Sequence, residues 1–296
     1  MKTDDGNIKG RISMYCRLLG VSREAFRKHL RNMDKPDKYK NIKKEILSLL
    51  NEDECNDTYG RRRLYEALLL KNININVPSE RTVYKIMKEM GIVHKTNRKP
   101  NGLTKADREA RKSDDILKRK FGAEEPFKKA VTDITELKCK NGKLYISSIF
   151  DCFDMAVIGL AMDINMKTEL CIRTVENAIK MHPELRGAIL HRDRGAQYTS
   201  EQYRRILRLY GIKQSMNSDG GRCHDNARCE SMWARMKTEL IYNRYDTEKM
   251  SVEEVKILVW RYFIGYWNNR RISSANGGLP PIIKRQMYYN NLPMAA

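Results

Sequence analysis

Three acidic residues occupy places where a carboxylate could do chemistry. Asp133 lies in the middle of the apolar run Ala130–Leu137, where a buried carboxylate would be costly without a cation to hold. Asp193 directly follows a second apolar region, and Glu230 stands about one turn into a predicted helix. Carboxylate oxygens are hard ligands that suit Mg²⁺ or Mn²⁺. If the fold brings the three acids together, they could hold two such ions and support phosphoryl transfer on a polynucleotide.

Basic residues accompany these acids. Lys237 lies seven residues beyond Glu230, about two helical turns, so it shares a helix face with that acid and could meet a phosphate backbone. A solvated lysine is the alternative interpretation. His191 and Arg192 precede Asp193 and could orient it or contact DNA. Each acid taken singly could be a surface or capping residue, but three acids at these places favour a metal site.

The elements that must position the acids are predicted to form an α/β domain over residues 128–245. Short runs rich in Val, Ile and Tyr, joined by short connections, predict three consecutive antiparallel strands over 130–137, 144–151 and 155–162, with a hairpin turn at Asn141-Gly142. Helices over 168–181, 200–210 and about 226–242 then alternate with strands over 188–191 and 212–215. This order is that of a ribonuclease-H-like mixed five-stranded sheet, in which the first and fourth strands are neighbours. The strand ends carrying Asp133 and Asp193 can therefore converge.

The segment ahead of this domain is predicted to consist of small all-α units. In residues 1–35, apolar residues recur at helical spacing, Gly20 interrupts them, and Ser22 is placed to cap a second helix, which is typical of a short helix-turn-helix. Residues 40–93 predict a second, helix-turn-helix-like unit, whose last helix begins near Ser79 and ends at Gly91.

That last helix presents a basic face. Arg81, Lys85 and Lys88 lie on the side opposite its apolar residues, as in a helix that enters a DNA groove. A solvated charged face is an equally good interpretation of this pattern. Residues 94–127 form a basic linker, and residues 246–296 form a C-terminal helical extension.

Composition narrows the class of partner. The chain has 57 Lys and Arg against 37 Asp and Glu, a formal net charge of +20, which favours nucleic acid. The seven cysteines suggest neither a disulfide framework nor a zinc site, because even the group Cys223, His224 and Cys229 has no standard zinc spacing. No apolar run reaches the ~20 residues of a membrane span. A reducing cytoplasm fits this pattern best.

Several motifs in this order resemble the integrase core of insertion-sequence DDE transposases of the IS-three type. They are Thr132–Thr135, Ile149–Asp151, His191–Ser200, Gly211–Met216, Asp225–Ala227 and Glu230-Ser231, together with Tyr59–Arg62 in the helical front and Tyr266–Ile272 near the end. The resemblance covers nearly the whole chain. It implies a retroviral-integrase-like catalytic core encoded by the second reading frame of the element.

The resemblance also implies an activity and partners. Asp133, Asp193 and Glu230 correspond to the metal-binding acids of the family, which nick the 3′ ends of an element and join them to target DNA with Mg²⁺ or Mn²⁺. The expected partners are double-stranded terminal repeats and target DNA, further copies of the chain bound to that DNA, and a helix-turn-helix protein from the upstream reading frame. The expected location is the bacterial nucleoid in the cytoplasm, with no membrane contact.

The chain departs from the family pattern at two points. Asp193 and Glu230 are separated by 36 residues, one more than the usual 35, and the extra residue falls in the loop 217–222. Ala130 stands where the family usually has Trp. Two other functions stay open: a catalytically silent DNA-binding protein derived from a transposase, and a nuclease acting on RNA–DNA hybrids. The second gives no reason for the helical front. Asp225 and Asn226 are expected as helix caps.

Overall fold

The computed structural model describes residues 12–33, 36–71, 76–92, 116–117, 121–193, 195–216, 227–242 and 244–290. The chain divides into two compact units, residues 1–44 and 45–296. None of the described helices has both the length and the apolar character that a membrane span requires. The linker expected over 94–127 lies mostly outside the described residues, as do Asp225, Asn226 and the loop 217–222.

The first unit contains the two short helices expected near the start of the chain. Helix α1 spans Ile12–Leu18 and α2 spans Arg23–Met33. Gly20 adopts a φ of 64° in the turn between them, a conformation that glycine takes without steric cost. The Ser22 hydroxyl accepts a hydrogen bond from the Ala25 amide at 3.0 Å, which confirms the predicted cap.

Helices also open the second unit. Helix α3 (Lys40–Asn51) runs across the boundary between the units and is followed by the short 3₁₀ helix η1 (Glu54–Thr58), α4 (Arg61–Lys71) and α5 (Glu80–Glu89). Helices α4 and α5 bury Leu64, Leu68 and Ile86. Helix α5 begins after Ser79, and Gly91 follows it with a φ of 70°, as the sequence predicts.

A mixed five-stranded sheet forms the centre of the second unit. Its strands are β1 (Lys129–Cys139), β2 (Gly142–Asp151), β3 (Val157–Asp163), β4 (Ile189–Arg192) and β5 (Lys213–Met216). Their order is β3-β2-β1-β4-β5, with β1, β2 and β3 antiparallel and with β4 parallel to both β1 and β5. The predicted ribonuclease-H-like topology is therefore confirmed. Only the hairpin shifts: Cys139 pairs with Gly142, so the turn is Lys140-Asn141.

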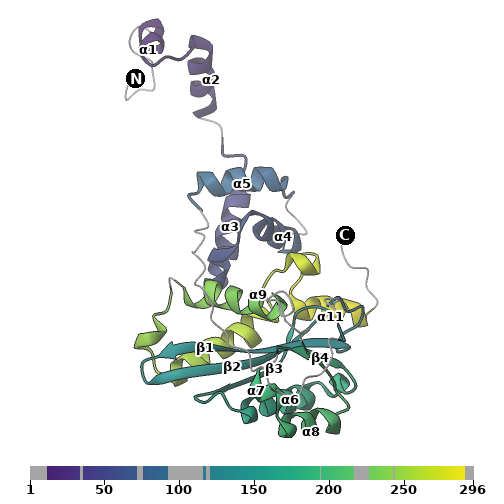
Figure 1. Ribbon diagram of the computed structural model, residues 1–296. Helices are drawn as coiled ribbons and strands as arrows, with labels where there is room; N and C mark the ends of the chain where they lie inside the picture. The colour runs from purple at the N-terminus through teal and green to yellow at the C-terminus, as the bar shows by residue number, and fades with distance from the viewer. Residues whose placement is uncertain are drawn as a thin grey trace. The chain divides into compact units, whose positions relative to one another are not determined.

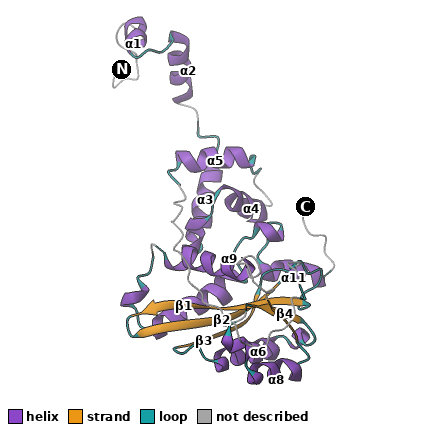
Figure 2. Ribbon diagram, viewed as in Figure 1, coloured by secondary structure: helices purple, strands orange, loops and turns teal. Residues whose placement is uncertain are grey.

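Helices cover both faces of this sheet (Figures 1 and 2). Helices α6 (Thr168–Met181), α7 (Ala196–Thr199) and α8 (Glu201–Leu209) pack on one face, with the 3₁₀ helix η2 (Pro183–Leu185) after α6. Gly159 on β3 lets α6 approach closely, because a Cβ atom there would lie 2.8 Å from the Ala178 side chain. Helix α9 (Ala227–Met236) lies on the other face and continues directly into the π-helical turn η4 (Lys237–Ile241).

The C-terminal extension is built into the catalytic domain. It comprises η5 (Thr247–Lys249), α10 (Val252–Trp260), the π-helical η6 (Arg261–Trp267), η7 (Ser274–Asn276) and α11 (Pro281–Tyr289). The Asn268 side chain accepts from the Val157 amide and donates to the Val157 carbonyl, at 2.8 and 2.9 Å. In α11, Arg285 forms buried ion pairs with Asp151 and Asp154. The extension therefore packs against the end of β2 and the start of β3.

Candidate active site

Strand register sets two of the three acids side by side. The parallel pairing of β1 with β4 ends at Val131 opposite His191. Asp133 and Asp193 each lie two residues beyond that pair, so continuing the register brings them level with each other. Adjacent parallel strands are about 4.8 Å apart, which is close enough for two carboxylates to act on one ligand.

Asp133 receives a hydrogen bond from the helix that crosses this edge of the sheet. Trp233 of α9 donates from its indole nitrogen to Asp133 Oδ2 at 3.2 Å. Burial, the neighbouring Asp193 carboxylate and, more weakly, Glu230 raise the pKa of Asp133 to about 8. Negative charge is thus concentrated at one place, where a divalent cation would relieve the repulsion. Sequence reasoning missed Trp233, although it stands three residues after Glu230 on the same helix face.

Asp193 and Glu230 approach this place from a turn and from a helix. Asp193 Oδ1 accepts a hydrogen bond from the Gly195 amide at 3.0 Å. A side chain at Gly195 would crowd this carboxylate, because a Cβ atom would lie 3.2 Å from the same oxygen. Glu230 lies in the first turn of α9 and is exposed.

The chemistry of these side chains fits a divalent metal, although their positions form no closed ligand cage. Within the described ranges, no group of three or more His, Cys, Asp or Glu side chains is close enough to hold one ion. Asp193 and Glu230 nevertheless act electrostatically on Asp133, so the three acids share one neighbourhood. All three offer hard oxygen ligands suited to Mg²⁺ or Mn²⁺. Cys229 is buried, and the other members of its sequence group lie outside the described residues.

Lys237 lies near the same acids. It is half-buried at the start of η4, and burial lowers its pKa, while Glu136 and Asp133 act in the opposite direction. Its ammonium group is thus within electrostatic reach of Asp133. This position is compatible with a role beside the reacting phosphate, and it is less compatible with a fully solvated lysine.

His191 and Arg192 do not form a DNA-contacting surface, and this corrects one of the two roles expected for them. The His191 ring is buried, and its Nδ1 lies 2.9 Å from the hydroxyl of Ser215 on β5. The Arg192 guanidinium is also buried and packs on the Tyr198 and Tyr203 rings, 4.8 and 5.3 Å from their centres. Successive strand residues point to opposite faces, and helices or neighbouring segments cover both faces here. The structure therefore supports the orienting role.

The basic face of α5 is exposed as expected. Arg81, Lys85 and Lys88 are exposed, and the Lys88 ammonium stacks over the Tyr84 ring at 4.8 Å. The residues facing the other way, among them Val83, are buried.

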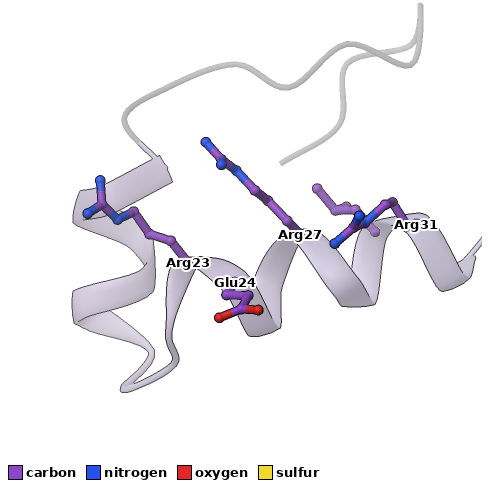
Figure 3. A pocket seen from close by; sticks show the side chains of 5 residues that line it. Arg23, Glu24, Arg27 and Arg31 are labelled. Atoms are coloured by element: carbon purple, nitrogen blue, oxygen red, sulfur yellow. The ribbon is translucent and has the colours of Figure 1, made fainter.

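A second basic face was not singled out from the sequence. Arg23, Arg27 and Arg31 recur every four residues along α2 and line an open pocket with Glu24 and Leu30 (Figure 3). The sequence offered the signal, because a spacing of four residues places side chains on one face of a helix.

Comparison with known proteins identifies the family. The Integrase core domain family matches residues 123–221 and, in a second description, residues 210–281, and an HTH-like domain matches residues 38–100. The chain is 33% identical over 270 residues to InsK of Escherichia coli K12, the transposase assigned to insertion sequence element IS150, with 91% of each chain covered. The chain belongs to the insertion-sequence transposases.

Two further likenesses accompany this assignment. The transposase is 31% identical over 223 residues to InsF of insertion sequence IS3A from Escherichia coli K12, covering 75% of each chain. Among solved structures, the HTLV-2 integrase catalytic core domain in complex with magnesium aligns with 55% of this chain and 99% of its own, at 16% identity and a TM-score of 0.41. The integrase core family match and the sheet order agree on the fold of the catalytic domain.

Proposed function

We propose that this transposase catalyses metal-dependent phosphoryl transfer at the ends of an insertion sequence, nicking the 3′ ends and joining them to target DNA. The observation that carries the proposal is the strand register, which sets Asp133 level with Asp193 under the helix that bears Glu230. These acids come from three separate elements, and an acid needed only for solubility would have no reason to lie at this edge.

Each residue has a distinct role in the proposed site. Asp133, Asp193 and Glu230 would hold the divalent ions, two per site. When bound, such ions supply activation of the attacking oxygen and stabilisation of the leaving oxygen. Trp233 orients the Asp133 carboxylate through its hydrogen bond, and the Gly195 amide orients Asp193. Lys237 contacts the DNA phosphate next to the acids, and its partial burial strengthens that contact.

The partners follow from the charge and the family. The exposed face of α5 binds double-stranded DNA of the element, which neutralises part of the excess positive charge. Terminal repeats and target DNA are the two substrates, and several copies of the transposase act together on them in the bacterial cytoplasm. A helix-turn-helix protein from the upstream reading frame contributes to recognition of the element ends.

One assay tests the proposal against the alternative of a silent DNA-binding protein. A labelled duplex carrying the DNA that flanks the gene is incubated with the transposase and Mg²⁺, and nicked and joined products are resolved. Wild-type protein should form both products, whereas Asp193→Asn and Glu230→Gln should form neither while still binding the duplex. Equal product from the wild-type and Asp193→Asn proteins would remove the enzymatic function. Cleavage retained by Glu230→Gln would show that another acid completes the site.

A further inference from the structure

Two sequence motifs that the proposed active site does not use meet in the folded chain. The first, Tyr59–Arg63, leads into α4 of the helical front, and the second, Tyr266–Ile272, ends η6 and continues beyond it. The Ile272 amide donates a hydrogen bond to the Tyr59 hydroxyl at 3.2 Å, and both side chains are buried. Since this contact joins positions 213 residues apart in sequence, the helical front and the C-terminal extension share an interface.

Both motifs contribute an arginine to the same carboxylate. Arg271 donates to both oxygens of Glu239, at 2.8 and 2.7 Å, and Arg63 donates to Oε1 at 2.8 Å. The Tyr262 hydroxyl donates to Oε2 at 2.9 Å. Only 3% of the Glu239 side chain and 4% of the Arg271 side chain are exposed, so this ion-pair cluster is dry. Burial alone would raise the pKa of Glu239, but the two arginines lower it to about 2.

Glu239 belongs to the helix that carries the proposed catalytic groups. It lies in η4, which continues α9 without a break, two residues after Lys237 and nine after Glu230. Arg63 grips this helix from α4 in the helical front, and Arg271 grips it from the C-terminal extension. A buried ion pair with several directed hydrogen bonds fixes geometry more effectively than it adds stability. The clamp is therefore well placed to set where α9 lies over the sheet.

Neighbouring arginines of α4 connect the clamp to the DNA-facing helix. Arg61 donates to Glu80 in the first turn of α5 at 2.6 Å. Arg62 is exposed and reaches only along its own helix, to Glu66. Arg63 crosses to Glu239. Successive arginines thus attach the start of α4 both to the helix with the basic face and to the catalytic helix.

We propose that Arg63 is a positioning residue that holds α9 in register with the strand acids, so that docking of the helical front on the catalytic domain completes the active site. This inference rests on the proposed function for its catalytic consequence. It assigns to the Tyr59–Arg63 motif a role in assembling the catalytic domain.

The test compares Arg63→Met with Arg62→Met in the full-length transposase. Methionine keeps most of the length of the side chain and removes the charge in both variants, and Arg62 is the matched control because its one ion pair is local and exposed. The single-turnover nicking rate is measured at saturating DNA and Mg²⁺, together with duplex affinity and amide hydrogen exchange over residues 227–242. All proteins are studied at equal distance below their unfolding temperatures, so that lost stability alone does not move the readouts.

Arg63→Met should nick roughly 10- to 100-fold more slowly than wild type with unchanged duplex affinity, because a displaced catalytic helix misplaces its acid. Its amides over 227–242 should exchange faster than those of Arg62→Met. Equal nicking rates and equal exchange in the two variants would overturn the proposal. If the wild-type protein does not nick DNA, the proposed function fails, and the exchange comparison by itself decides whether Arg63 holds α9.

Discussion

Replacing Glu239 by glutamine should destabilise the transposase substantially. The substitution keeps the shape of the side chain but removes the charge that faces two arginines, one of them almost fully buried. Removing one member of a buried ion pair costs about 3–5 kcal/mol, because the remaining charge is left uncompensated. The lowering of the Glu239 pKa from 4.5 to about 2 corresponds to a similar amount, roughly 3 kcal/mol. For a unit of this size, the unfolding temperature should fall by roughly 10 °C.

The effect should depend on pH with a defined sign. The folded-state pKa of Glu239 is lowered, so its stabilisation is fully present above the unfolded value of 4.5 and is lost as the pH falls towards about 2. The difference in unfolding free energy between wild type and Glu239→Gln should therefore be largest at neutral pH and shrink across that window. Urea unfolding at a series of pH values measures it.

A surface glutamate provides the control. Glu248 pairs with Lys138 at 3.9 Å, and both side chains are about 70% exposed, so Glu248→Gln should change the unfolding free energy by less than about 1 kcal/mol. A Glu239→Gln protein as stable as this control at neutral pH, or a loss of stability that does not shrink in acid, would refute the reasoning about the clamp.

Three further predictions concern other parts of the molecule. Asp133→Asn should stabilise the metal-free protein, and the gain should grow from about pH 4 to about pH 8, because the raised pKa makes ionisation of Asp133 increasingly costly there; unfolding temperatures in EDTA that fall or stay level would contradict this. Lys85→Ala should weaken duplex binding and flatten its dependence on salt by about one unit per lost phosphate contact, so unchanged salt slopes would exclude α5 as a DNA surface. Arg285→Met should cost about 3–5 kcal/mol in urea unfolding, since it strands Asp151 and Asp154 in the interior; a cost below 1 kcal/mol would mean that water reaches them.

Local patterns were sufficient to predict the architecture of the catalytic domain. Short runs of β-branched and aromatic residues placed the strands, and helical periodicity placed α6, α8 and α9 within a few residues. Asp133 stood out because a mid-strand acid conflicts with burial. The hairpin was misplaced by one residue, because Gly142 was taken as part of the turn when it opens β2.

Contacts across the chain could not be predicted in the same way. Proximity of His191 and Arg192 to an acid in sequence said nothing about exposure, since strand alternation and packing on both faces bury them. The bond from Trp233 to Asp133 spans 100 residues, and the pair Arg63 and Glu239 spans 176. With 57 basic and 37 acidic residues, composition allows far too many pairings for the correct one to be read from sequence.

The central claim is that residues 133, 193 and 230 share divalent metal. The most direct measurement is anomalous diffraction from crystals of the full-length transposase soaked in Mn²⁺. The account predicts manganese peaks between the Asp133 and Asp193 carboxylates, with Glu230 turned towards them as a further ligand. Manganese bound elsewhere, or bound to the strand acids while Glu230 stays directed into solvent, would contradict it.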